Sequence, residues 1–314
     1  MKKNIIFIIT LLIFLCIGCN KTEHENNETK IEENTPVFYK ITKKDSSTTL
    51  YLLGSIHAAD DTAYPLNEKI MAAFKQSDYL AVEVDINNAI SNFEEQMKLA
   101  QMMLYNDNTT IKNHIGDELY NSMIEFLKQK KSYNSLYDNY KPMFFESLFE
   151  NLIIKDANMD SNKGIDMHFL NEASELNKDI LELESVEFQY NLLLGLPIEI
   201  SMMNIESYIN DYDKSVSEMR NLYEAWKRGN LKELNNLIFS ESDEQLTVEQ
   251  QKLIDDYNNK LIIDRNYNMF NKLNEYFIEE KKVFCVVGLA HVIGEDGIVN
   301  LLKKEGYIVK QIEY

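Results

Sequence analysis

Two stretches near opposite ends of the chain place a histidine three residues after a glycine that ends an apolar run. They are LLGSIH, residues 52–57, and VVGLAH, residues 286–291. The chain has five histidines and ten glycines in 314 residues, so this spacing is expected by chance roughly 0.16 times. An imidazole at the end of a strand can bind a metal ion or transfer a proton. His57 and His291 are therefore the first candidates for chemistry.

Carboxylates follow two other strand-like runs in a similar way. In YLAVEVD, strand alternation places Glu83 and Asp85 on one face, and in DILELES it places Glu182 and Glu184 on one side. Ligands of open α/β sheets bind beyond the carboxyl ends of the strands, where these side chains and the two imidazoles would meet. Two histidines and one carboxylate with an open position are the ligand set of a catalytic metal site.

The elements that would position these residues follow from hydrophobic periodicity. VFYKIT and TTLYLLG flank the polar turn KKDSS and predict a β-hairpin. The later strand–helix–strand order predicts a mainly parallel sheet. The fold class expected is α/β, with a mainly parallel central sheet, an N-terminal antiparallel hairpin and a large helical cap insertion. The expected strands are 37–42, 48–54, 79–85, 179–185, 282–288 and 307–314, the expected helices include 66–76, 86–105 and 110–131, and the cap covers about 86–178 and 186–280.

Several segments together resemble the TraB/GumN family, which includes pheromone-shutdown proteins and Tiki-type metalloproteases. The segments are LLGSIHAADDTAYPL, AVEVD, GIDMHFLNEA, LELESVEFQ, DRNYNMF and VVGLAHVIGEDGIVNLLKKEGY. They occur in order across residues 37–314, and the paired G-x-x-H motifs are specific to this group in combination. The resemblance implies a related fold and, by analogy, metal-dependent hydrolysis of peptide bonds.

Carried over residue by residue, the resemblance implies that His57, His291 and Glu83 are functional positions. His57 and His291 would bind the metal, and Glu83 would be a further ligand or the general base. The alternative for the histidines is to cap a turn or to hydrogen-bond the backbone. Glu83 could instead form an ion pair with a buried arginine.

Asp166, Glu184 and Arg265 match other characteristic positions of the family and are candidate catalytic residues. Asp166 follows Gly164 and could equally cap a helix. Glu184 lies just before a predicted helix and could complement its dipole. Arg265 could clamp a substrate carboxylate or polarise a carbonyl, or it could pair with Glu83 or Asp166.

The other histidines and the cysteine in the domain have structural interpretations. His168 is interpreted as a contact in the cap region, and His24 and His114 as solvated side chains. Cys285 lies inside the apolar run VFCVV with nothing basic beside it in sequence, so it is interpreted as a buried structural thiol.

Composition and missing motifs narrow the function. The formal net charge of −19 argues against binding nucleic acid or anionic lipid headgroups through a basic patch. The sequence contains no H-E-x-x-H, G-x-S-x-G, G-x-x-x-x-G-K-[ST], G-x-G-x-x-G or C-x-x-C motif. Serine-hydrolase, nucleotide and dinucleotide chemistry therefore lack support.

The N-terminal residues are typical of a bacterial lipoprotein. Residues 1–18 combine two lysines with an apolar run and are interpreted as a signal peptide that is cleaved before Cys19. Cys19 would then be lipidated, and the polar residues 19–36 would form a disordered tether to the domain at 37–314. We expect attachment through this N-terminal lipid only, on the extracytoplasmic face of the cell membrane. An uncleaved signal anchor is the alternative.

The sequence thus predicts a lipid-anchored extracytoplasmic hydrolase that acts on a peptide or protein substrate with a divalent metal. Mn²⁺, Co²⁺ and Zn²⁺ all remain compatible, and the nearby carboxylates favour Mn²⁺ slightly. One alternative is a non-catalytic lipoprotein that binds or sequesters a peptide in the same cleft. Another is a structural or interaction lipoprotein whose two histidines are a remnant of the fold.

Overall fold

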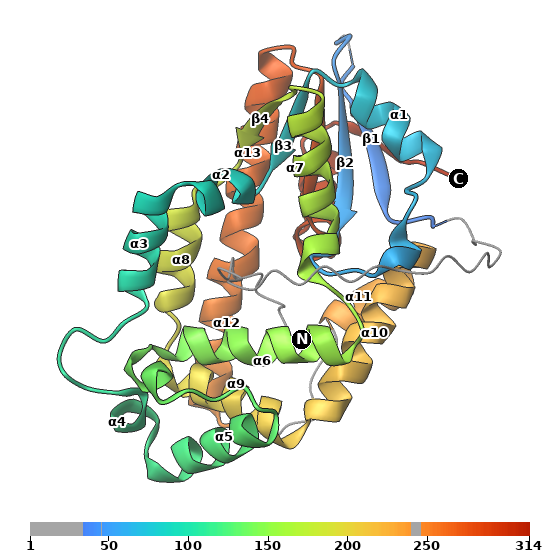
Figure 1. Ribbon diagram of the computed structural model, residues 1–314. Helices are drawn as coiled ribbons and strands as arrows, with labels where there is room; N and C mark the ends of the chain where they lie inside the picture. Colours follow the sequence, from blue (N-terminus) through green and yellow to red (C-terminus); the bar gives the residue numbers. More distant parts are fainter. Residues whose placement is uncertain (1–33, 45, 240–245) are drawn as a thin grey trace.

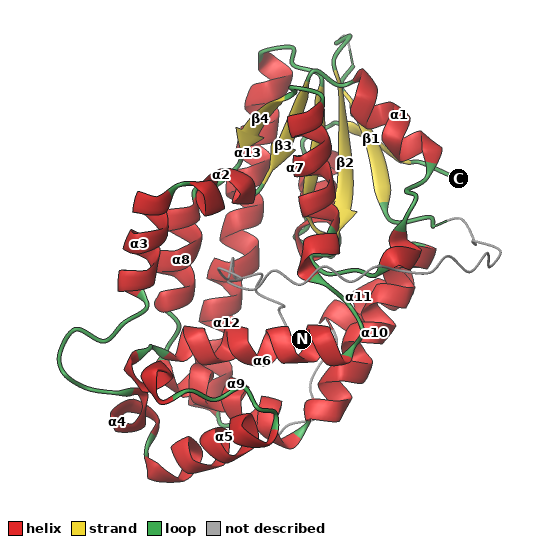
Figure 2. Ribbon diagram, in the orientation of Figure 1, coloured by secondary structure: helices red, strands yellow, loops and turns green. Residues whose placement is uncertain are grey.

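The computed structural model describes residues 34–44, 46–239 and 246–314. A mixed sheet and a group of helices beyond its end dominate this part of the chain (Figures 1 and 2). The strands are β1 (Phe38–Thr42), β2 (Thr49–Ser55), β3 (Tyr79–Val82), β4 (Asp179–Glu182), β5 (Val283–Gly288) and β6 (Ile308–Gln311).

The described strands form one six-stranded sheet in the order β4-β3-β5-β2-β1-β6. β4, β3, β5 and β2 are parallel neighbours, whereas β1 is antiparallel to both β2 and β6. The expected α/β fold class, with its mainly parallel sheet, its N-terminal hairpin and its many cap helices, is therefore confirmed.

Helices cover both faces of the sheet. They are α1 (Glu68–Gln76), α7 (Ile165–Glu175), α13 (Asp264–Ile278) and α15 (Ile298–Lys304). In Figure 1, α1 and α7 lie in front of the sheet and α13 lies behind it. The ring centroid of Phe284 in β5 lies 5.5 Å from that of Phe74 in α1 and 4.8 Å from that of Phe169 in α7. Every residue of β5 is buried, as expected for a parallel strand that is covered on both sides.

The helical cap lies beyond the carboxyl ends of the parallel strands (Figure 1). It contains α2 (Ile86–Ser91), α3 (Phe93–Met102), α4 (Ile111–Ile115), α5 (Asp117–Gln129), α6 (Pro142–Asp156), α8 (Val186–Leu194), α9 (Ile198–Asn210), α10 (Tyr212–Arg228), α11 (Leu231–Phe239) and α12 (Val248–Asn258). A π-helical turn, Asn259–Ile263, joins α12 to α13, and the short helix α14 (Leu289–Val292) follows β5. Three 3₁₀ segments are Asp61–Ala63, Ser135–Asn139 and Ser161–Lys163.

Two expected helices are each broken in two. The run 110–131 divides into α4 and α5 at Gly116, whose φ of 80° is a conformation that favours glycine. The run 86–105 divides into α2 and α3 at Asn92, whose side chain accepts a hydrogen bond from the backbone N–H of Glu95. The hydrophobic periodicity predicts the helical residues there, but it does not reveal the interruptions.

Two expected strands end earlier than predicted because a helix begins there, and the last one, 307–314, ends at Gln311. β3 ends at Val82, and Asp85 caps α2 by accepting a hydrogen bond from the Asn88 N–H at 3.1 Å. β4 ends at Glu182, and Ser185 caps α8. Glu83 and Asp85 therefore do not share a strand face, and the alternation argument for Asp85 was wrong.

The described chain begins with residues that already contact the domain. The side-chain amide of Asn34 donates to the Thr62 carbonyl at 2.8 Å, and the Thr35 N–H donates to the Lys227 carbonyl at 2.7 Å. The sequence interpretation places these residues in the tether. The signal peptide, Cys19, His24 and the rest of the tether lie outside the described residues.

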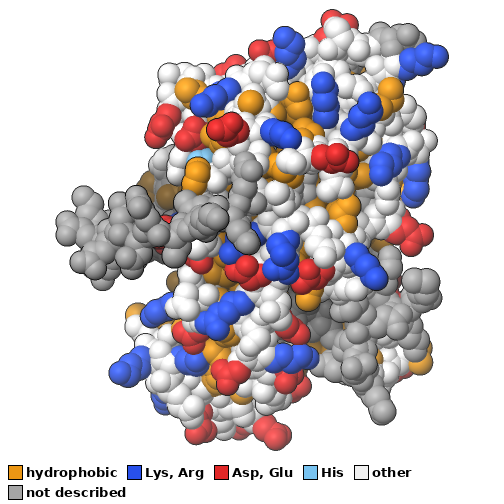
Figure 3. Space-filling view, turned by 90° about the vertical axis from the view of Figure 1, so that its right-hand side faces the viewer, with side chains coloured by type: hydrophobic (Ala, Val, Ile, Leu, Met, Phe, Trp, Pro, Cys, Tyr) orange, Lys and Arg blue, Asp and Glu red, His pale blue; other side chains and the backbone are white. Residues whose placement is uncertain are grey.

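The surface carries charges of both signs. On the face shown in Figure 3, Lys and Arg side chains are interspersed with Asp and Glu, although the formal net charge is −19. Among the described residues, no single helix is long and apolar enough to cross a membrane. The pair α8 and α9 has the length and composition together, but the two helices meet at 86°.

Candidate functional site

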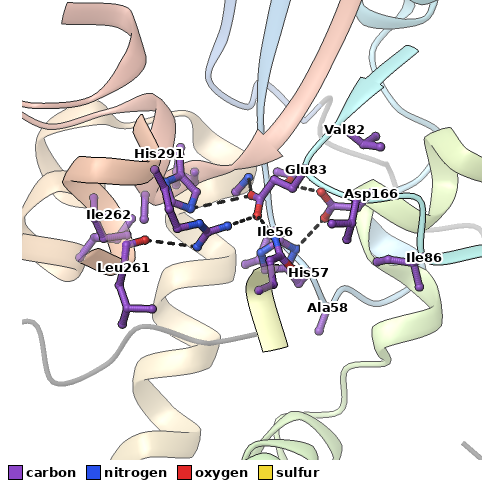
Figure 4. Close-up of a pocket in the computed structure, with 18 of the residues that line it drawn as sticks. Ile56, His57, Ala58, Val82, Glu83, Ile86, Asp166, Leu261, Ile262 and His291 are labelled. Carbon is purple, nitrogen blue, oxygen red and sulfur yellow. Dashed lines mark hydrogen bonds and ion pairs between the residues drawn. The ribbon is translucent and has the colours of Figure 1, made fainter. Parts of the chain in front are cut away.

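A cavity of about 130 Å³ lies at the carboxyl ends of three neighbouring parallel strands, under the helical cap. His57 follows β2 by two residues, Glu83 follows β3 directly, and His291 lies in α14 just after β5. Side chains of α8 and α10, such as Leu192 and Leu222, close the cavity from the cap side. Figure 4 shows Glu83 between His291 on one side and His57 with Asp166 on the other.

Gly288 permits the close approach of these groups. A Cβ atom at this position would lie 3.1 Å from Nε2 of His57 and 3.2 Å from Oε1 of Glu83. The backbone N–H of Gly288 donates to Oε1 of Glu83 at 2.8 Å. The glycine of this G-x-x-H motif thus serves to admit neighbouring side chains, and a tight turn is not its purpose.

Arg265 is held between two carboxylates. Its Nη2 donates to Oε2 of Glu83 at 2.6 Å and to Oε2 of Glu184 at 2.8 Å, and its Nε donates to Oε1 of Glu184 at 2.9 Å. Its Nη1 donates to the Leu261 carbonyl at 3.2 Å. The Gln189 amide donates to Oε2 of both glutamates, at 3.1 and 2.9 Å. Only Oε1 of Glu83 is left beside the cavity, and it also accepts from the backbone.

His57 is oriented by Asp166. Nδ1 of His57 lies 2.8 Å from Oδ2 of Asp166, while Oδ1 of Asp166 accepts the hydroxyl proton of Ser55 at 2.8 Å. Asp166 lies in the first turn of α7 and is buried. Because a carboxylate only accepts hydrogen bonds, Nδ1 of His57 carries a proton and Nε2 is directed to the cavity.

His291 is buried and has a neutral partner. Its Nδ1 lies 2.7 Å from Oδ1 of Asn266, a residue with 0% exposure. Its Nε2 lies 4.0 Å from Oε1 of Glu83. The two G-x-x-H histidines therefore direct their Nε2 atoms toward the same carboxylate region. Their motif glycines, Gly54 and Gly288, lie near the ends of the neighbouring strands β2 and β5, one residue apart in register.

Burial and charge move three pKa values in different directions. Burial lowers the pKa of His57, but the charge and hydrogen bond of Asp166 and the charge of Glu83 outweigh burial and raise it to about 8. Burial raises the pKa of Glu83, but the Arg265 charge and then the two histidines lower it to about 2. Burial, followed by the Arg265 charge, lowers the pKa of His291 to about 3. At neutral pH, His57 is therefore mostly charged and His291 is neutral.

The donor atoms fit a metal ion in chemistry, although they do not form a closed cage. Among the described residues, no three His, Cys, Asp or Glu side chains are gathered closely enough to hold an ion. The expected set of His57, His291 and Glu83 is therefore not preformed, because Arg265 and Gly288 hold the Glu83 carboxylate. The 4.0 Å between Nε2 of His291 and Oε1 of Glu83 is about twice a metal–ligand bond of roughly 2.0–2.2 Å. Both Nδ1 atoms contact oxygen acceptors, as is usual for metal-binding histidines.

The other candidates lie partly inside and partly outside this site. Glu184 and Arg265 belong to it, and Arg265 pairs with Glu83 and Glu184, not with Asp166 as one alternative had it. Four residues that the sequence brought into consideration lie elsewhere: Asp85, Glu182, His114 and His168. Glu182 accepts from the Asp85 N–H, His114 stacks on Tyr105, and His168 packs against Tyr64.

Cys285 is buried inside β5, and burial raises its pKa well above the ordinary value, so the thiol is not activated. Sequence reasoning missed Ser55, Gln189 and Asn266. Each lies within or beside a segment that carried the family resemblance: Ser55 in LLGSIH, Gln189 in LELESVEFQ and Asn266 in DRNYNMF. That position was the available signal, because a neutral side chain shows no pattern of its own.

Comparison with known proteins supports the family resemblance that the sequence motifs indicate. A protein of Xenopus tropicalis named Metalloprotease TIKI1 is 20% identical over 97% of this chain and 68% of its own length. One of Danio rerio named Metalloprotease TIKI2 is 19% identical over 98% and 68%. The uncharacterized protein YbaP of Escherichia coli is 22% identical over 47% of this chain and 52% of its own length. No solved structure matches significantly. The model of the TraB/PrgY/gumN family matches residues 37–311, and the chain belongs to that family.

Proposed function

We propose that this protein is a hydrolase that cleaves peptide bonds with the help of a divalent metal ion. The observation that carries the proposal is that His57, His291 and Glu83 line one cavity, at the ends of three neighbouring strands. Two imidazoles and a carboxylate suit the binding of an ion that activates water. The similarity to two proteins named metalloproteases supports the same reaction class.

In this proposal, each side chain of the site has a separate role. His57 and His291 hold the ion through Nε2, and Oε1 of Glu83 is a further donor. When bound, the ion supplies a water of lowered pKa and polarises the scissile carbonyl. Glu83 suits the role of ligand better than that of general base, because a carboxylate with a pKa of about 2 accepts protons poorly. Asp166 holds the Nδ1 proton of His57 and keeps Nε2 directed inward.

Arg265 has a positioning role in this proposal and no direct role in binding substrate. Its guanidinium already donates to Glu83, Glu184 and the Leu261 carbonyl, so few of its five N–H donors remain for a substrate carboxylate. It fixes one oxygen of Glu83 and leaves the other beside the cavity. The apolar walls, among them Ile86 and Leu192, exclude water and receive substrate side chains.

The test is metal content together with hydrolysis by the purified full-length protein. We expect bound Mn, Co or Zn, and cleavage of a peptide library that a chelator abolishes and one of these ions restores. His57→Gln and His291→Gln should each remove metal and activity. His114→Gln is the matched control, because His114 lies outside the cavity against Tyr105. Metal-free protein whose cleavage is insensitive to chelator would contradict the proposal.

A second candidate function is peptide binding without turnover in the same cavity. The observation in its favour is that both oxygens of Glu83 already accept hydrogen bonds, from Gly288 and Arg265, so no free base is prepared. Retained affinity for a library peptide, with no cleavage at any added ion, would select this candidate over the hydrolase.

We also propose that the protein is a lipoprotein on the extracytoplasmic face of the cell membrane. The basis is the N-terminal order of two lysines, an apolar run and Gly18-Cys19 in the sequence. Cys19→Ala should move the mature protein out of the membrane fraction or leave it unprocessed. A Cys285→Ala variant is the control, since that thiol is buried in β5. Unchanged fractionation and an unchanged mass of the mature N-terminus would contradict lipidation.

A further inference from the structure

Asn266 is the only polar side chain that contacts Nδ1 of His291 among the described residues, and it is completely buried. Its side-chain amide could face His291 in two ways. With Oδ1 toward the ring, the proton of the imidazole is on Nδ1; with Nδ2 toward the ring, that proton is on Nε2. The two orientations have opposite consequences for the atom that faces the cavity.

The second contact of Asn266 decides between them. Nδ2 of Asn266 lies 2.9 Å from the backbone carbonyl oxygen of Asp296. A carbonyl oxygen accepts and never donates, so Nδ2 must face Asp296 and Oδ1 must face His291. Nδ1 of His291 is then the donor, and Nε2 carries a lone pair. That lone pair faces Oε1 of Glu83, another acceptor, at 4.0 Å.

The Asp296 carbonyl is itself held in place by the loop that carries it. The Asn300 side chain donates to the Gly294 carbonyl at 2.7 Å, and the Gly297 N–H donates to the same carbonyl at 3.3 Å. A Cβ atom at Gly297 would lie 2.2 Å from the Ile293 carbonyl oxygen, so this bend admits only glycine. The backbone of residues 294–297 therefore determines the orientation of the Asn266 amide. That amide in turn determines which nitrogen of the His291 ring carries the proton.

We infer that Asn266 is a positioning residue that keeps the proton of His291 on Nδ1 and its lone pair on Nε2. The structure also indicates why such a residue is needed. Without Asn266, the ring could place its proton on Nε2 and donate it to the nearby Oε1 of Glu83, which would block Nε2 as a metal donor. The effect on metal binding rests on the proposed function; the effect on the ring does not.

The test is nitrogen NMR of the full-length protein with ¹⁵N-labelled histidine at neutral pH, without added metal. The His291 signal is assigned by its loss in His291→Gln. The wild-type ring should show a protonated Nδ1 and an unprotonated Nε2. Asn266→Leu should shift the proton to Nε2. Asn266→Asp should restore it to Nδ1, because a carboxylate is an acceptor only. Asn271→Leu, at an exposed position of the same helix, is the control for the added leucine.

Metal titration of the same variants provides a second readout. Loss of a hydrogen-bonding partner behind a metal-binding histidine costs about 10–100-fold in affinity, so Asn266→Leu should bind that much more weakly and Asn266→Asp should recover much of the loss. A wild-type ring with its proton on Nε2, or an Asn266→Leu ring unchanged from wild type, would overturn the inference. If Asn266→Leu does not fold, the wild-type and Asn266→Asp spectra still decide. Failure of all variants to bind metal would count against the proposed function alone.

Discussion

The two oxygens of the Glu83 carboxylate have different partners, and this difference defines the chemistry of the site. Oε2 contacts Arg265 and Gln189, whereas Oε1 accepts from Gly288 and lies nearest to His291. A second carboxylate, Glu184, shares the guanidinium, so two negative charges surround one positive charge. The site therefore keeps an excess negative charge, which favours a bound cation.

Removing the guanidinium should be far more damaging than removing a surface arginine. Arg265→Met would leave Glu83 and Glu184 buried without a counter-charge, and such a loss costs about 3–5 kcal/mol. We expect that decrease in the free energy of unfolding by urea titration. Arg228→Met is the control, because Arg228 pairs with Glu233 at the surface and such pairs contribute about 0–1 kcal/mol. Equal losses in the two variants would contradict the buried network.

Metal binding should release a proton from His57 near neutral pH. The pKa of His57 is raised to about 8, so an ion that binds Nε2 at pH 7 must displace a proton, whereas at pH 9 it displaces none. Deprotonation of His57 should raise the affinity about tenfold per pH unit up to pH 8, and above pH 8 His57 adds no further gain. His291 adds no such dependence there, because its pKa is lowered to about 3.

Calorimetry in buffers of different ionisation enthalpy measures this proton release. His57 should contribute about one proton per ion at pH 7 and none at pH 9, in addition to any proton that the ion-bound water releases. In the Asp166→Asn variant, which removes the charge that raises the His57 pKa, the release at pH 7 should fall. An affinity that is independent of pH between 6 and 8 would show that Nε2 of His57 does not bind the ion.

At the scale of elements, the π-helical turn sets the register between cap and sheet. α12, the turn Asn259–Ile263 and α13 form a continuous helical path that brings Leu261, Ile262 and Arg265 to the cavity wall. π-Helical turns contain one residue more than the α-helix allows and often occur at functional sites. The turn lies between the buried residues Ile254 and Tyr257 of α12 and Arg265 of α13.

Deleting the exposed Lys260 should convert the turn to regular α-helix and disrupt this arrangement. One residue corresponds to a rotation of about 100°, so Ile254 and Tyr257 would turn out of the cap core while α13 keeps its place. Loss of two such side chains costs several kcal/mol at roughly 1.5–3 kcal/mol each. Thermal unfolding should report a large drop, whereas Lys260→Ala should melt like the wild type. A deletion variant of unchanged melting temperature and metal affinity would contradict the role of the turn.

The elements were more predictable than their boundaries and their neighbours. All six described strands were expected, because short β-branched and apolar runs bounded by turns carry a local signal. The ends of β3 and β4 were missed because Asp85 and Ser185 act as helix caps, which alternation alone does not reveal. The π-helical turn has no sequence signature, and the order of the strands depends on contacts between distant segments.

The candidate site was predictable only in its charged and repeated parts. His57 and His291 stood out by matched spacing, and Glu83 by its place near the end of an expected strand. Asn266 and Gln189 did not stand out, because an amide acquires its function only from the acceptors that tertiary structure places around it. For the same reason, the pairing of Arg265 with Glu184 was not expected, and only Glu83 and Asp166 were considered as its partners.

At the scale of the whole molecule, the N-terminal end of the described chain should contribute to stability. A chain that begins at Val37 lacks the Asn34–Thr62 and Thr35–Lys227 hydrogen bonds, each worth about 1 kcal/mol. It should melt several degrees lower than a chain that begins at Asn34. A chain that begins at Asn20 should melt with the latter, because residues 20–33 are polar and offer little apolar surface. Equal melting of all three would show that Asn34 and Thr35 contribute nothing.

The order in which the sheet can assemble during synthesis follows from the position of β5. This strand lies between β2 and β3, yet it is encoded almost at the end of the chain. Until β5 is made, β2 can pair only with β1, and β3 only with β4, so the sheet would consist of two separate pieces with open edges. Chains with unpaired strand edges of this kind are prone to aggregation. Only when Val283–Gly288 emerges can the pieces join, and the same six residues deliver His291 to the cavity, so the cavity is assembled late in synthesis.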